Sequence, residues 1–388
     1  MPDVYYALGL HMHQPPGNLA LLIEHNEWEA QQIIRCYERA ARYAHTYKDV
    51  ARFHVGFSGI LLEQFKDRRM IELYKRFVDI PRMIESYSKA KNIEIIGMGY
   101  YHPIFPLIPK EDWPEQLRRG RAIIKEMFGR EPRGFWPSEM AFCMEMIPAL
   151  REAGYEYVVV DHVHIQSLAD RKMADCFQPY RARHEGSEIA VIPRNRDISN
   201  AQESGMDPRW LLHEVHHKVS SFPNADTTRL VTTWSDGENG GWFRQTDEAA
   251  GFFGHFFSPF MEKVRSGETE IRPVTISDFL SKHPPRDEAF VQTGAWNVAS
   301  TSGYDFTQWA GTLSQKKAVE ALCRTSRAYW QLKNQTGLSG ERVKKMEEAR
   351  ELILGAETSC YLFWGDAWIP RIYDKLKAAN ELLQYYPS

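Results

Sequence analysis

Residues 5–16 read YYALGLHMHQPP, and this stretch decides the fold. It opens with six apolar residues, Tyr5–Leu10, and changes at once to the polar sequence His11-Met12-His13-Gln14. A short apolar run of this length predicts a buried strand. Polar groups directly after such a strand are typical of β/α barrels, where reactive side chains follow the carboxyl ends of the strands. The stretch therefore predicts the first strand of a barrel, with functional groups at its end.

Six further short apolar segments have the same character. They are Arg52–Phe57, Ile93–Gly97, Gly134–Trp136, Glu156–Val160, Ile189–Ile192 and Leu230–Trp234. Amphipathic segments lie between them, namely Trp28–Ala44, Met70–Lys89, Trp113–Phe128 and Glu145–Ala153. This alternation predicts an α/β fold with a parallel sheet, and about seven strands favour a closed or nearly closed barrel over an open, doubly wound sheet. No Gly-x-Gly-x-x-Gly follows the first strand, which weakens the dinucleotide-binding alternative.

The chain changes in character near residue 285. His283-Pro284-Pro285 interrupts the alternation and indicates a linker or long turn. Residues 294–311, rich in glycine, serine and aromatic residues, are expected to form an ordered loop. Three segments with helical periodicity follow, Ser314–Lys333, Gly340–Ile353 and Trp368–Tyr385. We therefore expect a barrel domain over residues 1–285 and a helical C-terminal domain over residues 286–388 that completes the cleft.

Composition excludes several classes of partner. The net charge of −3 provides no surplus of cations for neutralising phosphates, so we expect no nucleic-acid partner. No apolar run approaches the roughly 20 residues needed to cross a bilayer, so we expect no membrane partner. The first residues lack the basic and apolar regions of a signal peptide. Five scattered cysteines without a C-x-x-C pair favour reduced thiols, and a cytoplasmic location is the expectation.

Two carboxylates stand directly beyond predicted strands. Glu139 follows the segment Gly134–Trp136, and Asp236 follows Leu230–Trp234 and precedes a glycine-rich turn. A pair of carboxylates that flanks one bond is the minimum apparatus for cleaving a glycoside. Each residue also has an ordinary structural interpretation. Glu139 is an acid suited to the start of a helix, and Asp236 is suited to a simple Asp-Gly turn.

Paired histidines support a rival hypothesis. His11 and His13 are two residues apart, so their imidazoles face the same way on a strand. Such pairs hold metal ions in barrel hydrolases, and His162-x-His164 and Asp236 are possible further ligands. The alternative is that the histidines hydrogen-bond sugar hydroxyls or each other. On the residues alone, a metal-dependent β/α-barrel hydrolase that uses His11 and His13 stays open.

Aromatic residues make up 13% of the chain and include 11 tryptophans. Indole rings fill protein cores, but their faces also stack on the apolar C–H patches of sugar rings. The candidates for stacking are Trp136, Trp242, Trp296 and Trp309.

Four motifs in chain order resemble those of glycoside hydrolase family 57, the group of α-amylases, 4-α-glucanotransferases and glycogen-branching enzymes. They are His11-Met12-His13-Gln14-Pro15, Glu94-Ile95-Ile96-Gly97 running to Tyr101-His102-Pro103, Gly134-Phe135-Trp136-Pro137-Ser138-Glu139, and Trp234-Ser235-Asp236-Gly237-Glu238. The segment Glu357–Gly365 resembles the family's helical-domain segment. Two features depart from the family pattern. Pro137-Ser138 stands where Leu-Pro or Leu-Thr is usual, and the chain is short and lacks an obvious C-terminal β-domain.

The resemblance implies an incomplete (β/α)7 barrel with a C-terminal helical bundle. It also implies a retaining enzyme that cleaves or transfers α-glucosidic bonds, with Glu139 as nucleophile and Asp236 as acid/base. His11, His13, His102 and Glu238 become candidates for contacts with sugar hydroxyls. The resemblance implies no metal and no cofactor for the chemistry, and an α-glucan or oligosaccharide as the partner. A non-catalytic glucan-binding protein on the same scaffold is the second alternative.

Overall fold

The computed structural model describes residues 3–220, 228–296, 306–335 and 339–384. Within these ranges every cysteine is a free thiol, and no helix is both long and apolar enough to cross a membrane.

Seven strands of the described chain form the barrel, and each overlaps one of the seven predicted segments. They are β1 (Val4–Met12), β2 (Phe53–Phe57), β3 (Ile93–Ile96), β4 (Gly134–Phe135), β5 (Tyr157–Asp161), β8 (Ser187–Arg194) and β9 (Arg229–Asp236). Strand β1 pairs in parallel with β2 and with β9, and β2 pairs with β3. Strand β5 pairs in parallel with both β4 and β8. The fold is therefore the expected α/β architecture with a parallel sheet.

Two weak joints make the barrel incomplete. Between β3 and β4 there is a single isolated bridge, Gly97 to Phe135. Between β8 and β9 the backbone NH of Asn195 donates to the carbonyl of Thr232 at 2.8 Å, just beyond the end of β8. The ladder thus forms two sheets that meet at these joints.

Side chains on β1 alternate between two cores. Leu8, Leu10 and Met12 pack outward with the helices, whereas Ala7 belongs to the cluster inside the barrel. Gly9 lies between them in the sequence, and a Cβ there would meet the ring of Trp234 at 2.1 Å. Residues on one face of a strand recur every second position, so His11 points inward with Ala7 and Gly9.

Four more strands were not predicted from the sequence. They are β6 (Ile165–Ser167), β7 (Tyr180–His184), β10 (Arg272–Pro273) and β11 (Asp287–Val291). Strand β11 pairs in parallel with β7 and antiparallel with β6. Residues 287–291, which we assigned to the helical domain, therefore belong to the sheet. The division of the chain into two domains remains a prediction.

The helices follow the expected order, with one correction. α2 (Glu27–Thr46), α6 (Trp113–Phe128) and α7 (Met146–Glu152) overlap three predicted segments. The single helix predicted over Met70–Lys89 is wrong, because it consists of α4 (Arg68–Tyr74) and α5 (Ile80–Lys89). Asp79 accepts a hydrogen bond from the backbone NH of Arg82, and Pro81 occupies the first turn, so a new helix begins there.

The remaining α-helices of the barrel region are all shorter than α2 and α6. They are α1 (Asn18–His25), α3 (Gly59–Lys66), α8 (Arg196–Ser204), α9 (Pro208–Ser220), α10 (Gly240–Phe243), α11 (Ser258–Ser266) and α12 (Ile276–Lys282).

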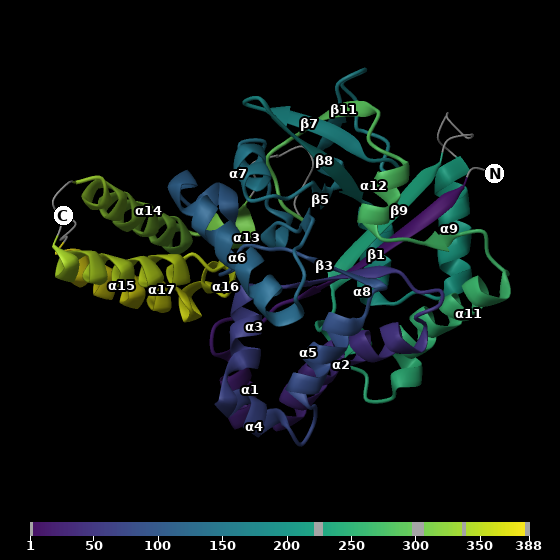
Figure 1. Cartoon of the computed structure of the whole chain (residues 1–388), viewed down its shortest axis with the longest axis horizontal. Helices are drawn as coiled ribbons and strands as arrows, with labels where there is room; N and C mark the ends of the chain where they lie inside the picture. Colours follow the sequence, from purple (N-terminus) through teal and green to yellow (C-terminus); the bar gives the residue numbers. More distant parts are fainter. Residues whose placement is uncertain (1–2, 221–227, 297–305, 336–338, 385–388) are drawn as a thin grey trace.

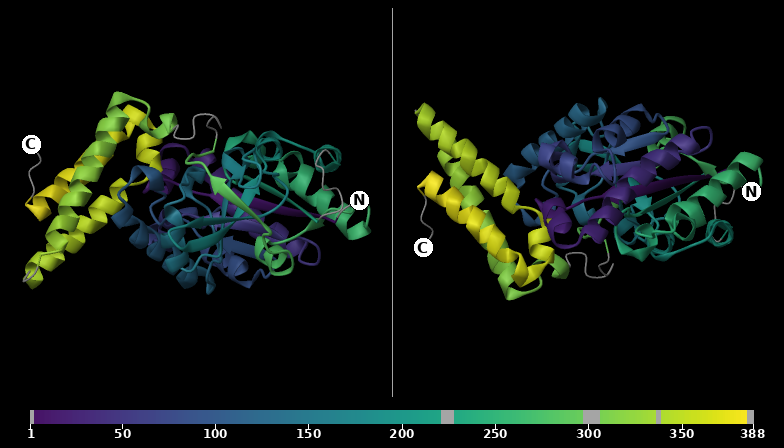
Figure 2. Two further views of the ribbon diagram at one scale, coloured as in Figure 1. Left: turned by 90° about the horizontal axis from the view of Figure 1, so that it is seen from above. Right: turned by 90° about the horizontal axis from the view of Figure 1, so that it is seen from below.

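Long C-terminal helices project from one side of the barrel, at the end opposite the N-terminus (Figures 1 and 2). They are α14 (Leu313–Lys333), α15 (Gly340–Ala356) and α17 (Ile369–Leu383), and the short helices α13 (Thr307–Ala310) and α16 (Ser359–Phe363) lie closer to the barrel. The three long ones confirm the predicted helices. Half of the loop expected over residues 294–311, namely residues 297–305, lies outside the described residues, and part of the other half is α13.

A buried charge cluster fixes the helices to the barrel. Asp112, which is fully buried before α6, accepts hydrogen bonds from Ser326 Oγ at 2.5 Å and from Trp330 Nε1 at 2.8 Å. Arg350 on α15 forms an ion pair with the same carboxylate. A buried charge is tolerated where it is paired and hydrogen-bonded, so this cluster fixes one relative placement of α14 and α15.

Candidate active site

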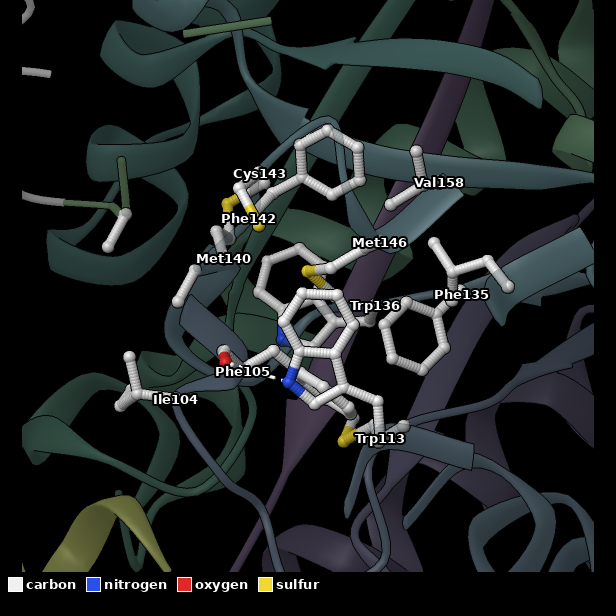
Figure 3. Close-up of a cluster of buried hydrophobic side chains, with 14 of the residues drawn as sticks. Ile104, Phe105, Trp113, Phe135, Trp136, Met140, Phe142, Cys143, Met146 and Val158 are labelled. Carbon is white, nitrogen blue, oxygen red and sulfur yellow. Dashed lines mark hydrogen bonds between the residues drawn. The ribbon is translucent and has the colours of Figure 1, made fainter. Parts of the chain in front are cut away.

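The end of β4 positions Glu139 in an unusual backbone conformation. The residue lies in the short 3-10 turn Ser138–Met140 with φ +56° and ψ +20°, the left-handed region that non-glycine residues seldom adopt. Met140 of this turn belongs to the same cluster of buried hydrophobic side chains as Trp136 and Phe142, which flank the turn in the sequence (Figure 3). Such strain persists only where the surrounding packing enforces it, and it is concentrated at functional sites.

Both carboxylate oxygens of Glu139 accept a hydrogen bond. Trp296 Nε1 donates to Oε2 at 2.9 Å, and Ser359 Oγ donates to Oε1 at 3.2 Å. The backbone NH of Trp296 also donates to the carbonyl of Glu139 at 3.0 Å. His102 Nδ1 lies 3.8 Å from Oε1. The side chain is thus held by hydrogen bonds from two distant parts of the chain, Trp296 and Ser359.

Asp236 is the last residue of β9 and is in register with His11 of β1. Its Oδ2 accepts a hydrogen bond from Asn239 Nδ2 at 2.6 Å. The backbone NH of Gly237 donates to the carbonyl of His11 at 2.8 Å, which fixes the turn after the strand. The first strand and the ninth therefore bring the first and fourth sequence motifs together.

Three predicted histidines form one cluster. The rings of His13 and His102 stack with centroids 3.8 Å apart and an interplanar angle of 9°. His11 and His102 approach each other through their Nε2 atoms at 3.1 Å. Burial lowers the pKa of His11 to about 3 and lowers those of His13 and His102 well below the usual value. All three are therefore neutral at neutral pH, and neutral imidazoles both donate and accept hydrogen bonds.

Glu238 contacts the backbone of His13. Its Oε1 accepts a hydrogen bond from the backbone NH of His13 at 2.6 Å, and its Oε2 has no partner among the described residues. Burial, and then the negative charge of Asp236, raise the pKa of this carboxyl well above its ordinary value. A protonated Glu238 has an O–H that is free to donate.

The two central carboxyl groups titrate near neutral pH. Burial, and then the charge of Asp236, raise the pKa of Glu139 to about 7. Burial raises the pKa of Asp236 to about 7 as well, with a further increase from Glu203. Removing a carboxylate from water disfavours its charged form, and a second negative charge nearby adds to that cost. The pair can therefore hold one proton between them at neutral pH, as acid/base chemistry requires.

The four candidate tryptophans are placed differently. Trp296 contacts Glu139 directly. Trp136 is fully buried and stacks on Trp234, with centroids 4.9 Å apart. Trp309 on α13 is fully buried too. Trp242 on α10 packs edge-on against Phe252 and His255. Stacking on a sugar requires an open ring face, whereas Trp136 and Trp309 are core residues in this structure. The stacking role of the four tryptophans remains a prediction.

The possible metal ligands are engaged elsewhere. His162 Nδ1 lies 3.1 Å from the carbonyl of Arg194, and His164 Nε2 lies 2.9 Å from the carbonyl of Ala295. Across the described parts of the chain, no three His, Cys, Asp or Glu side chains are grouped as a metal site. The histidine pair His11 and His13 instead contacts His102, Ser58 and Cys360.

Comparison with known sequences decides the family. A profile described as glycosyl hydrolase family 57 matches residues 7–292, which is most of the chain. The chain belongs to glycosyl hydrolase family 57. It is 27% identical over 320 residues to an α-amylase of Pyrococcus horikoshii, a match that covers 82% of this chain and 45% of that protein. It is 26% identical over 317 residues to a 4-α-glucanotransferase of Thermococcus litoralis, covering 82% and 43%. The chain thus spans a little under half the length of these relatives.

Solved structures of family 57 enzymes share the fold. A branching enzyme of Thermococcus kodakaraensis superposes with a TM-score of 0.73 at 17% identity, covering 99% of this chain and 91% of that one. The 4-α-glucanotransferase of Thermococcus litoralis gives a TM-score of 0.68 at 22% identity, covering 97% and 60%. These likenesses confirm the incomplete barrel with C-terminal helices.

Three residues of this family 57 site were missed by the sequence analysis. Arg194, at the end of β8, donates to the carbonyl of Trp234 at 2.7 Å and lies over the Trp296 ring at 5.8 Å. Ser359 and Cys360 enter from α16, where Cys360 Sγ lies 2.8 Å from His13 Nε2. Arg194 was visible as a polar residue at a strand end. The two α16 residues had only the resemblance of Glu357–Gly365 to the family's helical segment as a signal.

Proposed function

We propose that this chain cleaves or transfers α-glucosidic bonds of α-glucans or maltooligosaccharides with retention of configuration. The observation that carries the proposal is the pair of partly buried carboxyl groups, Glu139 and Asp236, whose pKa values both lie at about 7. Membership of family 57 supports the substrate class, because the relatives compared above include an α-amylase and a 4-α-glucanotransferase.

In the first step, Glu139 attacks the anomeric carbon as Asp236 gives its proton to the departing glycosidic oxygen. In the second step, Asp236 removes a proton from water or from a sugar hydroxyl, and that oxygen displaces Glu139. A retaining enzyme needs carboxyl groups about 5–5.5 Å apart, which is the separation expected for this pair in a complex with substrate. The free Oε2 of Glu238 and the neutral histidines are suited to binding sugar hydroxyls.

Incubation with maltooligosaccharides, followed by sizing of the products, tests the proposal. Shorter products alone indicate hydrolysis, longer ones indicate transfer, and new α-1,6 branches indicate a branching enzyme. Proton NMR of the first product formed shows its anomeric configuration, and an inverted product refutes the double displacement.

Two controls address the other hypotheses. Loss of turnover on exhaustive chelation, restored by a metal ion, would favour the metal-dependent hydrolase that uses His11 and His13. Glucan binding by the wild-type chain without turnover on any α-glucan would favour a non-catalytic binding protein.

A further inference from the structure

Ser359 reaches the site from the helical part of the chain. It is the first residue of α16, lies 220 positions beyond Glu139 in the sequence, and is fully buried. Its Oγ contacts two groups of the site, Glu139 Oε1 at 3.2 Å and His102 Nδ1 at 2.8 Å. A buried hydroxyl between a histidine and a candidate nucleophile is placed to influence that nucleophile.

The backbone around Ser359 is docked on the barrel. The NH of Ser359 donates to the carbonyl of His102 at 2.9 Å, and Thr358 forms an antiparallel bridge with Pro103. One residue earlier, Glu357 Oε2 accepts a hydrogen bond from Gln116 Nε2 of α6 at 2.6 Å. The loop after β3 and helix α6 therefore fix where the hydroxyl lies.

The hydrogen bonds that link His11, His102, Ser359 and Glu139 can be assigned one consistent order of donors and acceptors. A serine hydroxyl has one proton, and if Ser359 gives it to Glu139, then His102 Nδ1 must donate to Ser359 Oγ. Nε2 of a neutral His102 then accepts from His11 Nε2, which leaves His11 Nδ1 as an acceptor. That atom is buried and has no partner among the described residues.

The opposite direction is less favourable. It would give His11 Nδ1 a buried proton without an acceptor, and it would leave Glu139 Oε1 without the donor from Ser359. Both changes leave buried polar groups unpaired at the expense of stability. The chain of donors therefore runs from His11 through His102 and Ser359 to Glu139.

We infer that Ser359 is a positioning residue that holds the ionised form of Glu139 through this directed chain of hydrogen bonds. The inference rests on the proposed function, in which Glu139 is the nucleophile. Trp296 provides the donor to the other oxygen, so each oxygen has one. Hydrogen bonds to a carboxylate favour its charged form and oppose the effect of burial.

Other charged groups of the site do not supply this stabilisation. Among the described residues, the titratable and charged side chains of the site around Glu139 are those of His11, His13, His102, Cys360, Asp236, Glu238 and Arg194. Burial keeps the histidines neutral and raises the pKa of the Cys360 thiol to about 12. Asp236 raises the pKa of Glu139. Arg194 is the one cation in this set, and it is paired with Asp161.

A titration that needs no substrate tests the inference first. The carboxyl carbons of glutamate are labelled with carbon-13 in the full chain, and the Glu139 signal is assigned by its loss in Glu139→Gln. In Ser359→Ala we expect the pKa of Glu139 to rise by about one unit, because a hydrogen bond to a charged group is lost. Ser359→Cys keeps a side chain of similar size but replaces the hydroxyl with a thiol, which is a weaker donor, so we expect a smaller rise in the pKa of Glu139. This variant also serves as the test if Ser359→Ala does not fold. Ser314→Ala, which removes a hydroxyl bonded to Asp366 on the same group of helices, is the matched control with no change.

Kinetics provide the second arm. The acidic limb of the pH profile of kcat/KM should move upward by the same amount in Ser359→Ala, so that activity falls about tenfold well below that limb. A Glu139 titration unchanged in both Ser359 variants overturns the inference, even where activity falls. A shifted titration in a chain without turnover on α-glucans supports the effect of Ser359 on Glu139 and refutes the proposed function instead.

Discussion

The carboxyl groups of Glu139 and Asp236 are surrounded in different ways. Glu139 accepts hydrogen bonds from Trp296 and Ser359, which lie 157 and 220 positions further along the chain. Asp236 accepts one from Asn239, three positions away. Both have a pKa of about 7, raised chiefly by burial.

The hydrogen bonds distinguish the two carboxyl groups, whereas their similar pKa values do not. Hydrogen bonds donated to both oxygens of a carboxylate stabilise its negative charge, which a nucleophile must carry. Asp236 accepts one hydrogen bond, so its negative charge is stabilised less, and the nearby carboxylate of Glu203 favours its protonated form. These local surroundings, rather than the pKa values, are the reason that we propose Glu139 as the nucleophile and Asp236 as the acid/base.

The largest effect should come from replacing each carboxyl group. Glu139→Gln should lower kcat by more than about 10³-fold on every substrate, because the nucleophile is lost. Asp236→Asn should be similarly slow on maltooligosaccharides, but it should still form the glycosyl-enzyme from an aryl α-glycoside, whose leaving group needs no proton. Burst kinetics with the two substrate types measure this. If both variants lost the same fraction of kcat on both substrate types, the proposed difference in roles between Glu139 and Asp236 would be wrong.

A smaller effect concerns stability. The pKa of Glu139 is raised on folding from 4.5 to about 7, so the folded state holds a proton that the unfolded state has lost, and its stability falls as pH rises through this range. Glu139→Gln removes this cost and should raise the free energy of unfolding by roughly 2–3 kcal/mol at pH 8, with little gain at pH 4.

Urea unfolding at the two pH values measures this gain. Glu152→Gln, at an exposed position on α7, is the control and should show no such pH dependence. A gain for Glu139→Gln that is equal at both pH values would contradict the raised pKa.

Trp296→Phe removes one donor from Glu139 and should move the acidic limb of kcat/KM upward by about one pH unit. The alkaline limb, which reports Asp236, should stay within a few tenths of a unit. Trp210→Phe, on the surface of α9, is the matched control. Movement of the alkaline limb alone would mean that Trp296 acts on the wrong carboxyl group.

Asn239→Ala should produce the smallest effect. It removes the hydrogen-bond donor to the Asp236 carboxylate, so the pKa of Asp236 rises. Asp236 then keeps its proton to a higher pH, and the alkaline limb of kcat/KM moves to higher pH. Asn239 is exposed, so solvent replaces part of the lost hydrogen bond and we expect a shift of roughly half a unit. An unchanged alkaline limb would show that Asn239 does not stabilise the charged form of Asp236.

The sequence alone predicted the strands of the barrel well. Apolar runs such as Leu230–Trp234 carry their own signal, because a strand buried on both faces is apolar throughout. Strands β7 and β11 were missed for the opposite reason. Tyr180–His184 alternates with arginine, and Asp287–Val291 follows two prolines, so neither has a continuous apolar run.

Glu139, Asp236 and the histidines were also proposed from the sequence, since each lies at or shortly after the end of a predicted strand, in a motif that resembles family 57. What only the tertiary structure decided is how they are held. Trp296, Ser359 and Arg194 contact the site from distant segments, and Trp136 and Trp309 turn out to be core residues. Local patterns record which face of a strand or helix is buried. They do not record which distant side chain donates to a given oxygen, because that depends on how the elements pack together.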